Sequence, residues 1–121
     1  MINFEMLGTV LSTGENQVYI TGFDKSDFAE NMNKLLDVEF ATKLEGYEQL
    51  FRMSDNYPFY QEFGIPAHTL STFDFKNFDH FHKPGDEVEI LELDNMNAII
   101  NLASLSILKM VNEGVSIRLK E

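Results

Sequence analysis

The chain has 121 residues, of which 44% are hydrophobic, enough for one compact domain with its own core. Its 20 acidic and 9 basic residues give a net charge of -11, so it lacks the positive charge that binds nucleic acids and anionic membrane surfaces. No apolar run approaches the roughly 20 residues of a membrane-spanning helix, and the lack of cysteine excludes disulfides and thiolate metal sites. We therefore expect a single domain over residues 1–121 that binds neither nucleic acid nor membranes.

The first third of the chain alternates strand and helix patterns. Apolar residues recur with a period of two over residues 2–6, and a second apolar run covers residues 17–21, so both are predicted strands. A helix is predicted over residues 27–36, with Ser26 placed to cap its exposed amide groups. Residues 38–44 have a weaker strand pattern and lead into an irregular stretch. One face of the predicted helix carries Phe28, Met32, Leu35 and Leu36.

The stretch "SDNYPFYQEFG", residues 54–64, has the features of a short helix. Ser54 or Asp55 is suitable as the N-cap, and Pro58 falls in the first turn, where its missing amide costs nothing. Gly64 is suitable as the residue at which the helix stops. The sequence therefore predicts a helix of about two turns here.

The rest of the chain is predicted to hold a strand, a loop, a long helix and a last strand. A buried strand covers residues 65–72, and residues 73–87 form a long loop, a kind of segment that is often functional in compact domains. The helix covers residues 94–114 with Asp94 as its cap, and residues 115–119 form the last strand. Strands alternating with helices predict a layered α/β domain. The helical spacing is kept by Met96, Ile99, Ile100, Ala103, Ile107, Met110 and Val111.

Motifs with strong catalytic spacing are absent from the sequence. There is no Gly-rich phosphate loop, no H-E-x-x-H zinc helix and no G-x-S-x-G nucleophile elbow. What remains is a set of imidazole and carboxylate side chains near predicted strand ends and in loops, the ligands that zinc takes when thiolates are missing. These candidates are Glu5, Asp55, His68, His80, His82 and Asp86.

Each candidate also has a purely structural interpretation that spacing alone leaves open. Glu5 fits the polar face of a half-buried strand, although the first strand of a parallel sheet is normally apolar on both faces. His68 lies inside a predicted strand and is most simply a core or sheet-face histidine. Asp55 is explained at least as well by helix capping.

The loop stretch "FDHFHKPGDEVE", residues 78–89, fits neither a helix nor a strand pattern. A loop histidine is more often solvated than a ligand, and at most one of His80 and His82 is expected to face a site. Asp86 is suitable as a turn residue. The residues alone therefore indicate an α/β domain with a possible metal-binding loop.

Three stretches in this order resemble the C-terminal half of the di-zinc aminopeptidase family, peptidase family M twenty-eight. They are "INFEMLG" at residues 2–8, "MSDNYPFYQEFGIPAHTLST" at 53–72 and "FHKPGDEVEIL" at 81–91, followed by a long helix. Three ordered motifs are more specific than one, and the resemblance covers nearly the whole chain. It implies an α/β/α arrangement with a mixed, mainly parallel sheet, the C-terminal part of the phosphorylase/hydrolase-like fold of zinc exopeptidases.

The resemblance implies that Glu5 ligates one zinc ion and that His82 ligates the other. The family usually has aspartate where this chain has Glu5, and the longer side chain would shift that metal. The irregular stretch around His82 is then explained, because it presents an imidazole to a metal. Met6 and Phe81, which adjoin these two positions, resemble walls of the pocket for the first side chain of a peptide substrate.

Further positions carry over as residues beside the site. Ser54 and Asp55 match a Ser-Asp pair of the family, although the histidine that usually follows is Asn56 in this chain. Asp86 matches an acid four residues beyond the loop histidine, where it would brace the loop or a ligand. The chain thus departs from the family pattern at position 56 and keeps it at position 86.

The chemistry implied is hydrolysis of the amino-terminal peptide bond by a hydroxide shared between two zinc ions. In the family, the other histidine, the bridging aspartate and the glutamate that acts as general base all lie upstream of the strand with which this chain begins. Each zinc would have one ligand from this chain, whereas stable sites need three or four. We therefore expect the chain to be one half of an enzyme, without zinc affinity or activity of its own and prone to self-association.

Two alternatives remain open beside the zinc aminopeptidase. One is a single-zinc enzyme on the same scaffold, such as a glutaminyl cyclase. The other is a metal-free interaction module, which Glu5 in place of aspartate and Asn56 in place of histidine both favour. The resemblance suggests an exported or periplasmic protein, but no export sequence occurs in this chain, so the compartment stays open.

Overall fold

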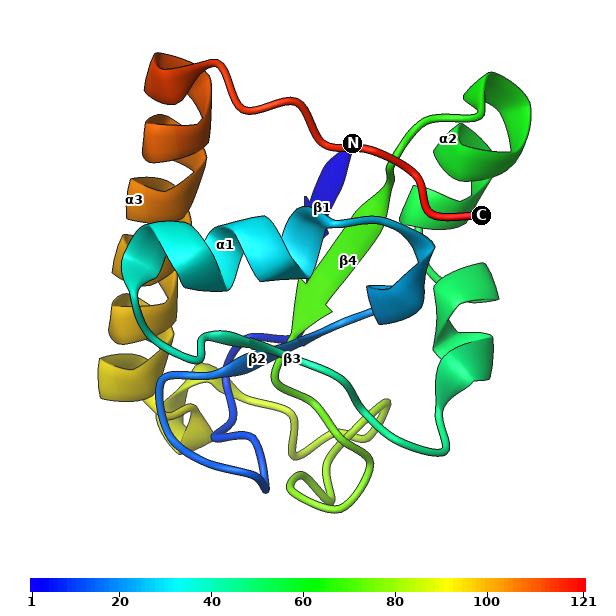
Figure 1. Ribbon diagram of the computed structural model, residues 1–121. Coiled ribbons are helices and arrows are strands. Elements are labelled where there is room, and N and C mark those ends of the chain that lie inside the picture. Colours follow the sequence, from blue (N-terminus) through cyan, green and yellow to red (C-terminus); the bar gives the residue numbers. More distant parts are fainter.

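The computed structural model describes residues 1–121 and contains one four-stranded sheet with helices packed on it (Figure 1). The strands are β1 (Ile2–Phe4), β2 (Val18–Ile20), β3 (Ala41–Thr42) and β4 (His68–Ser71), in the spatial order β1-β4-β2-β3. β1 runs parallel to β4 and β2 runs parallel to β3, whereas β2 and β4 are antiparallel. The predicted mixed, mainly parallel sheet is confirmed.

Three α-helices cover the two faces of the sheet. α1 (Phe28–Leu36) and α3 (Leu93–Glu113) pack against each other on one face, and α2 (Asn56–Phe63) lies on the other side of β4 (Figure 1). This is the layered α/β arrangement that the sequence predicts. Short 3-10 helices in the connections are η1 (Phe23–Lys25), η2 (Glu48–Arg52) and η3 (Val88–Ile90).

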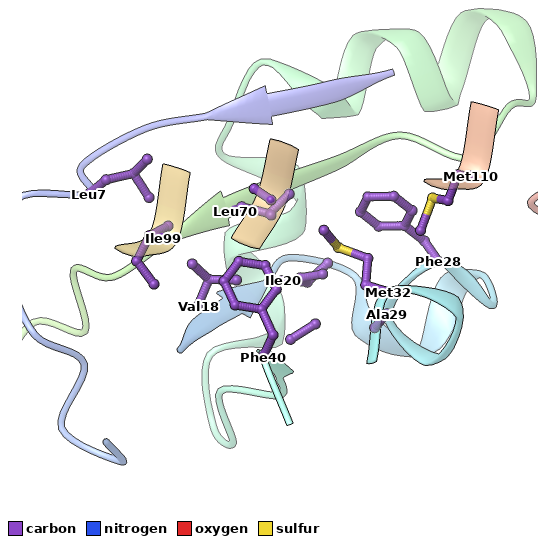
Figure 2. Close-up of a cluster of buried hydrophobic side chains, with 12 residues drawn as sticks. Leu7, Val18, Ile20, Phe28, Ala29, Met32, Phe40, Leu70, Ile99 and Met110 are labelled. Atoms are coloured by element: carbon purple, nitrogen blue, oxygen red, sulfur yellow. The ribbon is translucent and has the colours of Figure 1, made fainter. Parts of the chain in front are cut away.

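The main core lies between the sheet and the pair of helices α1 and α3 (Figure 2). Leu70, at the centre of β4, is fully buried, and its neighbour Ile20 on β2 points to the same face. Burying side chains of this size contributes roughly 1.5–3 kcal/mol each and fixes α3 against the sheet. The helices contribute Phe28, Ala29, Met32, Ile99, Ala103 and Met110 to this core.

The opposite face of β4 is polar, and Asn56 at the start of α2 organises it. The Asn56 side chain is fully buried and donates hydrogen bonds to the carbonyl oxygens of Phe51 (3.2 Å) and Ala67 (3.3 Å). Its Oδ1 accepts hydrogen bonds from the hydroxyls of Thr69 (2.8 Å) and Thr21 (3.4 Å). Asn56 therefore ties α2 to β4 and to η2, and it is a structural residue in this fold.

Each α-helix begins within two residues of its predicted first residue, but the predicted capping residues are only partly confirmed. Ser26 Oγ accepts a hydrogen bond from the Phe28 amide at the start of α1, as predicted. Asp55 occupies the N-cap position of α2 without capping it by a side-chain hydrogen bond. The prediction that Asp94 caps α3 is wrong, because α3 begins at Leu93 and places Asp94 in its first turn, where its charge favours the helix dipole.

The predicted last strand over residues 115–119 is not part of the sheet. It makes a single isolated bridge, between Ser26 and Leu119, and backbone hydrogen bonds join it to Asp27 and Lys25. The physical reason is its position: it runs beside the start of α1, where no strand edge offers a ladder of partners. The other predicted strands are all present but shorter than predicted.

An exposed apolar surface lies at the β1 edge of the sheet and along α3. β1 pairs only with β4, and its side chains Ile2 and Phe4 are 36% and 43% exposed. On α3, Ile100 and Val111 belong to the predicted apolar face, yet they are 48% and 72% exposed. The apolar stripe of α3 is therefore wider than the surface that the sheet and α1 cover.

Candidate functional site

Glu5 directly follows β1, and the sheet fixes its position. Its backbone amide donates a hydrogen bond to the Leu70 carbonyl oxygen (3.2 Å), which continues the β1–β4 pairing by one residue. The carboxylate accepts hydrogen bonds from Ser54 Oγ (2.9 Å) and from Asn3 Nδ2 (3.0 Å). Glu5 is half-buried, so a carboxylate held by two neighbours still reaches the surface. Ser54 thus lies beside Glu5 in the structure.

A chain of hydrogen bonds connects this carboxylate to the buried Asn56. Asn3 Nδ2 donates both to Glu5 and to Thr69 Oγ1 (3.0 Å), and the Thr69 hydroxyl donates in turn to Asn56 Oδ1. Asn56 therefore acts on Glu5 only through two intervening side chains. Asp55 is exposed at the start of α2, and the structure gives it no hydrogen bond or ion pair.

The loop over residues 73–87 is confirmed as a loop, and its first part is firmly anchored. Asp74 is 2% exposed and accepts hydrogen bonds from the amides of Ser12 (2.7 Å) and Lys76 (3.0 Å). Burial alone would raise the pKa of Asp74, but these hydrogen bonds outweigh it and hold the pKa below its usual value. Asn77 Nδ2 donates to the Thr72 carbonyl oxygen (2.7 Å), which closes the first turn.

His82 is held by stacked rings and lies outside any regular element. Its ring stacks on Phe81 with the centroids 3.9 Å apart, and Phe81 stacks on Phe73 at 4.8 Å. The imidazole is exposed, and His82 has a left-handed backbone with φ 56. His80 lies instead against Gly85, where an added Cβ atom would be 2.5 Å from its Nδ1.

Strained backbone conformations occur on both sides of this region. Met6 has φ 50 and Phe75 has φ 68, values that side-chain-bearing residues seldom adopt, and His82 shares this property. Each costs roughly 1–3 kcal/mol and persists only where the surrounding structure requires it. Such residues concentrate at functional sites, which makes this end of the sheet the strongest candidate.

Met6, Phe81 and Asp86 line one pocket of about 280 Å³. Met6 and Phe81 are the chain neighbours of Glu5 and His82, but neither Glu5 nor His82 is itself among the residues that line the pocket. Asp86 lies at its surface. The remaining walls are mostly apolar and include Leu7, Phe73, Phe78, Leu91 and Met96. The structure therefore brings together three of the residues that the sequence assigns to one site.

The donors present do not make a complete zinc site. No group of three or more histidine, cysteine, aspartate or glutamate side chains in the chain is arranged to hold a metal ion. Glu5 has Ser54 and Asn3 as its hydrogen-bond partners, and His82 has the Phe81 ring. Zinc needs three or four protein ligands, so these 121 residues alone do not fit it.

A buried Ser–His pair was not predicted from the sequence. His68 Nδ1 lies 2.9 Å from the Thr21 carbonyl oxygen and therefore carries the proton, so Nε2 accepts the hydrogen bond from Ser26 Oγ at 2.6 Å. Burial lowers the pKa of His68, although the hydrogen bond to Thr21 opposes that shift. Ser26 and His68 are 1% and 2% exposed, so the pair is structural, and the interpretation of His68 as a core histidine agrees with the structure.

The separation of the two partners explains why sequence reasoning missed the pair. Ser26 and His68 are 42 positions apart, and no motif connects them.

None of the helices is both long enough and apolar enough to cross a membrane. The chain matches no protein-family model, and comparisons with curated proteins and with solved structures found no match.

Proposed function

We propose that this chain supplies one side of the active site of a zinc-dependent aminopeptidase. In this proposal Glu5 and His82 each offer a ligand to a different zinc ion, and the remaining ligands and the general base come from residues outside these 121. The observation that carries the proposal is the pocket lined by Met6, Phe81 and Asp86, since Met6 and Phe81 directly follow and precede the two ligand positions in the sequence. The motif resemblance supports it independently.

The positions of the supporting side chains are consistent with this role. The Ser54 hydroxyl and the Asn3 amide hold the Glu5 carboxylate in one orientation, and the Phe81 ring holds the His82 imidazole. Ligands that are fixed by neighbours before the metal binds lose less conformational freedom on binding. Asp86, which lines the pocket, would add negative charge around the site, and Asp55 would do so from the start of α2.

The shape of the pocket predicts the substrate class. A cavity of about 280 Å³ with mainly apolar walls suits the side chain of a leucine, methionine or phenylalanine residue at the amino end of a peptide. A charged side chain would lose its hydration there without a partner on most walls. We therefore expect peptides with a large apolar first residue to be the preferred substrates.

The test compares the 121-residue chain with the product of the complete reading frame that contains it. Zinc content is measured by mass spectrometry, and hydrolysis is measured with leucyl, glutamyl and amino-terminal glutamine reporters. For the chain alone we expect zinc affinity weaker than about 10 µM and no hydrolysis, because each metal has one ligand. A longer product is expected to hold zinc and to cleave the leucyl reporter.

Variants then connect the activity to this chain. In a product that hydrolyses the leucyl reporter, Glu5→Ala and His82→Ala are expected to lower kcat/KM at least about 100-fold, since ligand loss at a metal centre removes that much or more. His80→Ala serves as the matched control and is expected to retain activity. Cyclisation of the glutamine reporter in place of peptide cleavage would favour the glutaminyl cyclase alternative. Absence of zinc and of both activities from the complete product would overturn the proposal.

A second candidate function is a metal-free interaction module that pairs through β1 with a second copy of the chain. Met1 and Glu5 form the hydrogen bonds to β4, so the backbone groups of Ile2 and Phe4 point toward the open edge of the sheet. Exposed strand edges with apolar side chains pair readily with other chains. The partly exposed Ile2 and Phe4 favour this candidate.

Sedimentation velocity tests the second candidate. The unmodified chain is expected to dimerise in a concentration-dependent way, and Phe4→Glu is expected to keep it monomeric. Phe59→Glu is the matched control, because Phe59 on α2 is similarly exposed (41%) but lies away from the β1 edge. A chain that stays monomeric, or equal dimerisation of both variants, would argue against this candidate.

A further inference from the structure

A second cavity lies apart from the site described above and shares no residue with the pocket of Met6 and Phe81. Its volume is about 370 Å³, and it is bounded by β2, η1, the segment after β3 and η2. This volume is within the range of roughly 300–1,000 Å³ that is typical of small-molecule sites. Nothing in the proposed aminopeptidase function uses it.

Four aromatic residues, Tyr19, Phe23, Tyr47 and Phe51, are among the fifteen that line this cavity. Gly22 has φ 65, and a Cβ atom at this position would lie 2.3 Å from the Phe51 ring, so only glycine allows Phe51 to lie this close to the backbone. Tyr47 forms another wall and is itself stacked on Phe75, with centroids 5.3 Å apart and nearly parallel rings. Lys25 Nζ lies 6.0 Å from the Phe51 ring centroid. Such a surface suits a flat aromatic group.

The residues that line the cavity include more basic than acidic side chains, in contrast with the chain as a whole. Lys25, Lys43 and Arg52 line it, which are three of the nine basic residues, whereas only Asp24 and Glu48 of the twenty acidic residues do so. Lys43 pairs with Asp24 at 2.7 Å and with Glu45 at 3.8 Å, so its charge is already balanced. Lys25 and Arg52 form no ion pair in the structure, so two cations remain available to a ligand.

We propose that this cavity binds a small aryl carboxylate. Its aromatic body would lie against Phe51 and Tyr47, and its carboxylate would face Lys25 and Arg52. A guanidinium group matches the geometry of a carboxylate through paired hydrogen bonds, and the aromatic walls favour a ring over an aliphatic chain. Lys25 and Arg52 would repel a ligand that carries a positive charge. Of two ligands with the same ring system, the cavity should therefore bind the anionic one more tightly than the cationic one.

The test uses three probes that separate the ring from the charge. Indole-3-acetate carries the ring and a carboxylate, tryptamine carries the same ring with an ammonium group, and acetate carries the carboxylate alone. In ¹H–¹⁵N NMR titrations of the labelled chain, indole-3-acetate is expected to shift the amides of Gly22, Lys43 and Phe51 to saturation. We expect tryptamine and acetate to bind at least about fivefold more weakly, because each lacks one of the two matching features.

Two substitutions at exposed positions test the role of the cations without disturbing the core. Lys25→Gln and Arg52→Gln are each expected to weaken indole-3-acetate binding about threefold, and about tenfold together, as for partly solvated charge pairs. Lys34→Gln, on α1, is the control and is expected to leave the affinity unchanged. The proposal is overturned by equal binding of tryptamine, by shifts that map elsewhere, by unchanged affinity in the double variant, or by no saturable shift at millimolar concentrations.

Discussion

The Ser26 hydroxyl lies 2.6 Å from Nε2 of His68, and both side chains are almost completely buried. Nδ1 of the same imidazole is satisfied by the Thr21 carbonyl oxygen. The ring also stacks on Phe28, nearly parallel at 5.4 Å between centroids. His68 therefore joins β4, β2 and the start of α1, and this connection makes the pair a test of how the fold is stabilised.

Ser26→Ala is expected to lower the free energy of unfolding by about 2 kcal/mol. The substitution leaves Nε2 of His68 buried without a partner. It also removes the hydroxyl oxygen that accepts a hydrogen bond from the Phe28 amide. Urea denaturation followed by circular dichroism measures the loss. Ser104→Ala, at an exposed position of α3, is the control and should change stability by less than about 0.5 kcal/mol. An equal effect of both substitutions would contradict the assignment.

The stability of the fold is expected to decrease as the pH falls below about 6.5. Burial lowers the pKa of His68 in the folded state, so below the ordinary pKa of about 6.5 the unfolded chain binds a proton that the folded chain does not. Acidification therefore favours unfolding until the pH also falls below the folded pKa. NMR titration of the imidazole and urea denaturation between about pH 7.5 and 5.5 measure the effect.

Comparison with the two loop histidines isolates this contribution. His68→Gln is expected to flatten the pH dependence, whereas the double variant His80→Gln/His82→Gln should retain it, because both loop imidazoles are exposed. If His68→Gln does not fold, the NMR titration of the unmodified chain decides alone. A His68 ring that titrates at or above the ordinary pKa would show the prediction to be wrong.

Asn56→Ala is expected to cost about 3 kcal/mol, because it leaves two buried carbonyl groups and two buried hydroxyl groups without their shared partner. Chemical denaturation measures the change. Asn101→Ala, on the exposed side of α3, is the matched control and should be close to neutral. A loss below about 1 kcal/mol at Asn56 would mean that water replaces the missing amide.

Gly22→Ala and Gly64→Ala form a matched pair that measures the close approach of Phe51. Both glycines have left-handed backbones, with φ 65 and φ 59, so each substitution costs roughly 1–2 kcal/mol for the conformation alone. Only at Gly22 would the new Cβ meet the Phe51 ring, whereas nothing lies within 4 Å at Gly64. Gly22→Ala is therefore expected to be the more destabilising by about 2 kcal/mol in urea denaturation. Equal losses of stability in the two variants would show that the close approach of Phe51 to Gly22 has no steric cost.

Much of the fold was predictable because it depends on local periodicity and turn residues. The apolar spacing predicted α3 to within two residues at its start and one at its end, and Gly64 ended α2 as predicted. The strand over residues 115–119 was predicted wrongly because an apolar alternating run becomes a strand only if a partner edge is available. Likewise, the pattern of α3 did not reveal that Val111 stays exposed, because neighbouring elements decide which part of a stripe is covered.

The candidate site likewise has features that were predictable from the sequence and features that depend on contacts between distant segments. The sheet-forming runs, the helices and the imidazole and carboxylate groups could be read from the chain, since they follow from composition and periodicity. Folding was needed to bring Ser54 to Glu5, to place Met6 and Phe81 in one pocket, and to bury Asn56 away from solvent. The first two relationships join residues 49 and 75 positions apart, and no local pattern encodes which distant segments meet when a core closes.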